Sequence, residues 1–98
     1  MNFSVVLKDP TKRHLLVYGH MEYARREMLD FFAMVKSRGA IMYQSQRLVK
    51  LPEGGTVRFA HVSDEIRGLE IDNYEVDGTV SRRMGGHPLL ALLATRVR

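Results

Sequence analysis

Most of the acidic side chains gather in one short stretch, residues 64–78. That stretch holds six carboxylates and one arginine, which give −5, so the remaining residues must carry +9 to reach the overall charge of +4. Its last carboxylate, Asp77, ends a predicted strand that begins at Leu69, and such a carboxylate can coordinate Mg²⁺. Gly78 comes next, and because Asp-Gly is a common turn dipeptide, a turn or a salt bridge is the plainer role for Asp77.

Arginine supplies the second kind of chemistry. Eleven of the fifteen basic residues are arginine, whose forked guanidinium suits phosphate and carboxylate groups. Arg82 and Arg83 precede a predicted helix that begins at Pro88, and free backbone amides at a helix N-terminus favour anions. Six arginines are therefore candidate contacts to nucleic acid or another anion: Arg25, Arg26, Arg82, Arg83, Arg96 and Arg98. A solvated basic surface and a flexible basic linker are the alternatives.

Several kinds of catalytic or metal site lack their sequence signature. The chain has no cysteine, which excludes disulfides and thiolate zinc sites. Its four histidines include no HxxxH pair, although a site assembled in three dimensions remains open, and there is no GxSxG elbow. No lysine follows a glycine, so the GxxxxGK[ST] phosphate loop is absent. We expect no catalytic residue, no metal and no cofactor.

The elements that must position these side chains follow from hydrophobic periodicity and turn residues. Five strands and two helices are predicted: strands over Phe3–Lys8, His14–Gly19 and Leu69–Asp77, a hairpin of Arg47–Leu51 with Thr56–Val62, and helices over Met21–Arg38 and Pro88–Arg98. A short helical turn is expected from Ser63 to Arg67, and a basic glycine-rich link over 81–86.

The helix from Met21 to Arg38 is the clearest of these elements. Apolar residues recur along it at spacings of three and four, which predicts one buried stripe: Met21, Ala24, Met28, Phe31, Phe32 and Val35. Gly39 ends the helix, after basic residues in its last turn.

This order of elements predicts an α/β fold in a single domain, residues 1–98. We expect a small mixed sheet, the long helix packed on one face of it, and a C-terminal helix. If the strands ending at Tyr18 and Val76 are parallel, the long helix forms a right-handed crossover over the sheet.

Two segments carry a resemblance to a known family. HLLVYGHMEYARREMLDFFAMVKSRGA, residues 14–40, resembles the strand and helix that follow the phosphate loop in phage terminase large subunits and related helicase-like ATPases. GGTVRFAHVSDEIRGLEIDNYEVDG, residues 54–78, is similar to the strands that come next, with Arg67 and Asp77 at positions that match the family pattern. The resemblance implies a truncated, degenerate P-loop ATPase core in a small phage-type protein. Gly78 stands where the family has its catalytic glutamate, so the resemblance implies no hydrolysis.

The leading functional hypothesis is a non-catalytic binding protein, not an enzyme, that contacts another protein. A nucleic-acid-binding module that uses the arginines is the alternative, and a residual nucleotide or Mg²⁺ binder that uses Asp77 is the third. The apolar final helix predicts a homodimer or a partner contact. No signal peptide and no membrane-length apolar run are visible, so we expect a cytoplasmic protein without membrane contact.

Overall fold

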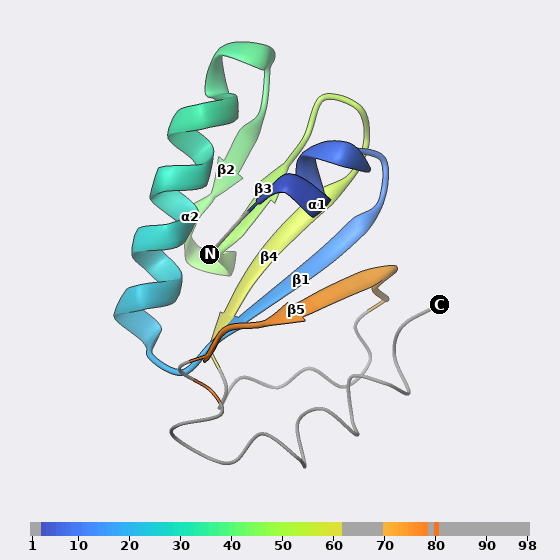
Figure 1. Ribbon diagram of the computed structural model, residues 1–98. Coiled ribbons are helices and arrows are strands. Elements are labelled where there is room, and N and C mark those ends of the chain that lie inside the picture. The colour runs from blue at the N-terminus through green and yellow to red at the C-terminus, as the bar shows by residue number, and fades with distance from the viewer. Residues whose placement is uncertain (1–2, 62–69, 79, 81–98) are drawn as a thin grey trace.

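The computed structural model describes residues 3–61, 70–78 and 80 (Figure 1). This part of the chain contains two α-helices, two 3₁₀ turns and five strands, in the order α1 (Ser4–Lys8), β1 (Arg13–Tyr18), α2 (Met21–Val35), η1 (Lys36–Arg38), β2 (Ile41–Tyr43), η2 (Gln44–Gln46), β3 (Leu48–Lys50), β4 (Thr56–His61) and β5 (Asn73–Val76). The predicted turn over Ser63–Arg67, the basic link and the final helix lie outside the described residues.

The strands form one mixed sheet in the order β2-β3-β4-β1-β5, which Figure 1 shows from edge to edge. β1 pairs in parallel with β4 on one side and β5 on the other, whereas β3 pairs antiparallel with both β2 and β4. The α/β class, the mixed sheet and the parallel relation of the strands ending at Tyr18 and Val76 are therefore confirmed. β1 lies inside the sheet, and its run of apolar side chains is buried on both faces of it.

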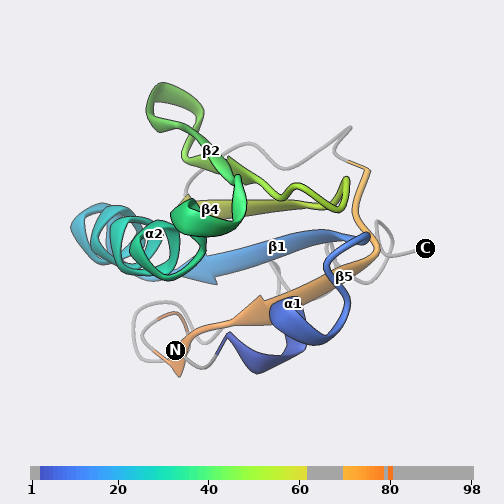
Figure 2. The same cartoon turned by 90° about the horizontal axis from the view of Figure 1, so that it is seen from above.

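Helix α2 packs on one face of the sheet, outside its plane (Figure 2). Ala24, Met28, Phe31 and Val35 are the buried members of the predicted stripe. Phe31 contacts Phe59 of β4, with ring centroids 5.8 Å apart. The prediction was wrong for two members of the stripe, because Met21 and Phe32 are only half-buried. Helical structure does extend to Arg38, as an α-helix to Val35 and a 3₁₀ turn over Lys36–Arg38. Gly39 ends that turn at a φ of 101°, a conformation that glycine adopts without steric cost.

The predicted strand over Phe3–Lys8 is wrong, because Ser4–Lys8 form the helix α1. Phe3, Val6 and Leu7 are spaced like one helix face, and they join the apolar cluster that also contains the buried side chains of α2. The β-branched composition of the segment suggested a strand, and packing against this cluster decided otherwise.

The hairpin around residues 52–55 is confirmed as β3 and β4, with slightly shorter strands. Gly55 must be glycine, because a Cβ atom there would lie 2.2 Å from the carbonyl oxygen of Pro10. Its amide donates to that oxygen at 3.0 Å, which fixes the loop before β1 to the start of β4. β2 was not predicted, since three residues are too few to show a period.

A second apolar cluster lies on the other face of the sheet. Leu15 and Val17 of β1 alternate with Leu16 and Tyr18, which face α2, because successive side chains of a strand point to opposite faces. Ala60, Ile71 and Val80 complete the second cluster. No helix among the described residues has the length and apolar character needed to cross a membrane.

Candidate functional site

The three parallel strands end at the same edge of the sheet, where ligands of α/β proteins usually bind. β1 ends at Tyr18, β4 at His61 and β5 at Val76, and α2 begins a few residues after β1. Figure 1 shows this edge at the lower left of the sheet. It is the natural candidate for a ligand site, and it carries Asp77.

Polar groups at this edge contact backbone groups of neighbouring strands. The Nε2 atom of His61 lies 3.1 Å from the carbonyl oxygen of Gly19. Because a carbonyl oxygen only accepts, Nε2 carries the proton in this contact. The amide of Asp77 donates to the carbonyl oxygen of Val17 at 2.8 Å, and the carbonyl oxygen of Asp77 accepts from the amide of Val80 at 3.0 Å. His61 and the backbone of Asp77 thus help to hold the strand ends together.

Tyr18 occupies the interior of this edge. Its side chain is fully buried and stacks on Phe59, with an interplanar angle of 12° and ring centroids 6.3 Å apart. Burial, and then the negative charges of Glu27 and Asp77, raise the pKa of Tyr18 well above its usual value. Its phenol therefore remains neutral and serves as a core group rather than an acid or base at neutral pH.

An open pocket of about 360 Å³ lies at the start of α2, lined by His20, Glu22, Tyr23 and Arg26. The Cζ atom of Arg26 lies 5.4 Å from the ring centroid of Tyr23, a cation–π contact. Arg25 is exposed and does not line the pocket. Since both Glu22 and Arg26 line the pocket, it carries charges of both signs, and this does not favour the binding of an anion.

The structure brings the predicted arginines together only in part. Arg25 and Arg26 are neighbours on α2, whereas the others lie outside the described residues: Arg67, Arg82, Arg83, Arg96 and Arg98.

No metal centre is formed by the part of the chain that the structure describes, because no three His, Asp or Glu side chains gather there. Asp72 and Asp77 lie beyond opposite ends of β5. At ~3.3 Å per residue their backbones are roughly 16 Å apart, so these two carboxylates do not share one ion.

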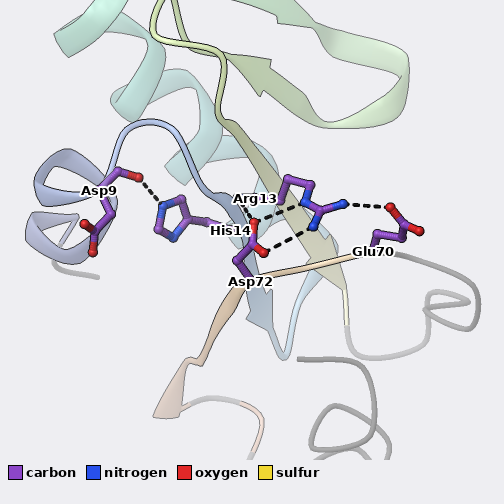
Figure 3. Close-up of polar contacts among 5 residues, drawn as sticks. All are labelled: Asp9, Arg13, His14, Glu70 and Asp72. Atoms are coloured by element: carbon purple, nitrogen blue, oxygen red, sulfur yellow. Dashed lines mark hydrogen bonds and ion pairs between the residues drawn. The ribbon is translucent and has the colours of Figure 1, made fainter. Parts of the chain in front are cut away.

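Asp72 instead belongs to a salt cluster at the other end of β5 (Figure 3). Its Oδ2 atom accepts from the amide of Arg13 at 2.8 Å and from Nε of Arg13 at 3.1 Å, while Oδ1 accepts from Nη2 at 3.2 Å. Glu70 accepts from Nη1 of Arg13 at 2.7 Å. Hydrogen bonds from the Arg13 side chain and amide lower the pKa of Asp72 to about 2.

The same contacts raise the pKa of Arg13. The amide of Asp72 also donates to the carbonyl oxygen of Arg13 at 2.8 Å. The cluster joins residues that are 59 positions apart in sequence, and it holds the start of β5 against β1. Its hydrogen bonds join β1 to the segment that leads into β5, so we assign it a structural role.

His14, also shown in Figure 3, is the buried polar side chain next to this cluster. Its Nε2 atom donates to the carbonyl oxygen of Asp9 at 2.9 Å. The contact fixes the end of α1 to β1, which is again a structural role.

The remaining surface feature is the edge strand β2, which the sequence reasoning missed. Ile41 is 52% exposed and Tyr43 is 41% exposed. Residues 36–50 contain four basic residues and no acidic one. The uncharged triplet Ile-Met-Tyr within a basic segment was the available signal, and it was too short to interpret alone.

No protein-family model, curated protein or solved structure matches this chain. The resemblance to terminase-like ATPases therefore stays a prediction from the sequence.

Proposed function

We propose that this chain is a non-catalytic binding protein that acts through contact with another protein. The observation that carries the proposal is the edge of the sheet at β2, where Ile41 and Tyr43 expose large apolar side chains on a strand without charge. Exposed apolar side chains that gather at a sheet edge commonly mark protein contacts.

The carboxyl edge of the parallel strands supports the non-catalytic part of the proposal. Tyr18 is buried and neutral there, and His61 binds a backbone carbonyl. Asp77 and Asp72 lie beyond opposite ends of β5, too far apart to share an ion. This arrangement favours structural roles over proton transfer or phosphoryl transfer, which needs a phosphate cradle.

Site-specific photo-crosslinking in extracts of the native host tests this function. Benzoylphenylalanine replaces Tyr43 on β2, Leu29 on α2 or Arg26 beside the α2 pocket, and covalent adducts are identified by mass spectrometry. We expect protein adducts that survive nuclease treatment and moderate salt.

Adducts that disappear with nuclease, together with binding that falls steeply with salt, would favour the nucleic-acid-binding module instead. The absence of a specific protein adduct at all three positions would refute a protein-binding function through the described surface.

A further inference from the structure

We propose that β2 is a docking strand, to which a partner protein adds an extended apolar segment flanked by acidic residues. The segment would continue the sheet beyond β2 by backbone hydrogen bonding, a known mode of peptide recognition. The inference rests on the proposed function and specifies the chemistry of its partner.

The sheet ends at β2 in a form that permits pairing. β2 is terminal in the strand order, and within the described residues it pairs with β3 alone. Proteins normally protect such an edge by keeping the strand short or by placing charged side chains or proline on it. β2 is short, but its three residues, Ile41, Met42 and Tyr43, include neither charge nor proline.

The side chains of β2 divide between the two faces of the sheet. Met42 is half-buried and packs against the apolar cluster beneath α2. Ile41 and Tyr43 therefore lie on the opposite face, where their cross-strand neighbours are Lys50 and Leu48. An added strand would place alternate side chains beside Ile41 and Tyr43 on this face.

Charge decides what kind of segment fits. Lys36 and Arg38 precede β2, Arg47 follows it, Lys50 lies opposite Ile41, and no acidic residue occurs from 36 to 50. Arg38 pairs with Glu53, which offsets part of this charge, while Lys36 and Lys50 are exposed. Acidic residues at the ends of the added segment would meet these lysines, and such complementarity steers association and fixes register.

A second copy of this chain fits the same edge less well. Pairing β2 with another β2 would bring two segments of charge +4 together without an acidic residue in either. An acidic segment removes the repulsion that a second copy would add.

Titration of the isotope-labelled full chain with a synthetic peptide, followed by NMR, tests the inference. The peptide has alternating valine and threonine at its centre and glutamates at both ends. We expect shifts centred on the amides of Ile41, Met42 and Tyr43, slower hydrogen exchange there, and binding that weakens with salt. A peptide with lysines at its ends, and one with N-methylated central amides, should each bind at least ~10-fold more weakly.

Matched variants separate β2 from the rest of the apolar surface. Tyr43→Lys should weaken peptide binding by about tenfold. Leu29→Lys should not, although Leu29 on α2 has the same 41% exposure as Tyr43. Lys50→Glu should reduce binding of the glutamate-ended peptide and improve binding of the lysine-ended one, whereas Lys8→Glu on α1 should leave both unchanged. The wild-type comparison of the peptides does not depend on the folding of any variant.

Four results would overturn the inference: no shifts at β2 at millimolar peptide, equal binding of the two charge versions, equal effects of Tyr43→Lys and Leu29→Lys, or displacement of the peptide by single-stranded DNA. Self-association through β2 in sedimentation experiments would assign the edge to a second copy and would also overturn it. Protein crosslinks from Leu29 or Arg26 together with a negative peptide titration would leave the proposed function standing and remove only the docking strand.

Discussion

Replacing Asp72 by Asn tests how much the Arg13 cluster contributes to the fold. Asparagine has nearly the same shape and keeps an oxygen acceptor, but it removes the charge that three hydrogen bonds from Arg13 now meet. The Asp72 side chain is 22% exposed and that of Arg13 is 38% exposed, so solvent screens part of the attraction. The variant should therefore lose stability without losing the fold.

The lowered pKa of Asp72 sets the scale of this loss. A decrease from 3.8 to about 2 corresponds to ~2.4 kcal/mol at ~1.36 kcal/mol for each pH unit. Solvent screening reduces this value, and we expect Asp72→Asn to lower the free energy of unfolding by ~1–2 kcal/mol at pH ~7. Because the pKa is lower in the folded state, the contribution is present above pH ~4 and is lost as the pH falls toward ~2.

Urea unfolding of both proteins at several pH values measures this contribution. The difference in unfolding free energy between wild type and Asp72→Asn should be largest near pH ~7 and should shrink toward pH ~2. Glu70→Gln is the control, because Glu70 makes one bond to the same arginine and its side chain is 59% exposed; its effect should stay below ~0.5 kcal/mol. If wild type and Asp72→Asn have the same unfolding free energy at pH ~7, or if their difference is as large at pH ~2 as at pH ~7, the charge of Asp72 does not stabilise the fold.

Three further predictions concern the packing of α2, the loop at Gly55 and ATP hydrolysis. Phe31→Ala should lower the free energy of unfolding by ~3–5 kcal/mol, and Phe32→Ala by clearly less, because only Phe31 is fully buried. Equal urea midpoints for the two variants would contradict the packing of α2. Gly55→Ala should destabilise by ~1–3 kcal/mol, because its Cβ would collide with the carbonyl of Pro10, and an unchanged melting temperature would show that this loop moves at little cost. A phosphate-release assay should detect no ATP hydrolysis, since the chain has no phosphate loop; turnover that Asp77→Ala abolishes would contradict a non-catalytic protein.

The candidate sites show where sequence reasoning succeeds and where it stops. The strand that leads to Asp77 was predicted over Leu69–Asp77, and the structure has a shorter one, β5, which ends at Val76 just before Asp77. Its surroundings were not predictable, since they depend on β1 and β4. The predicted arginine set was drawn from composition, and the structure gives a position only to Arg25 and Arg26.

The sequence by itself determined the elements that carry a strong local period. The stripe of α2 and the apolar run of β1 each follow from nearby residues, and so does the β3–β4 hairpin around its glycines. Only the tertiary structure decided the order of the strands, the helical state of Ser4–Lys8 and the exposure of β2. The pairing of Arg13 with Asp72 belongs to the same group, because the two residues are 59 positions apart. A period of three or four residues is fixed by local backbone geometry, whereas strand order and ion pairs depend on which distant surfaces bury the most apolar area together.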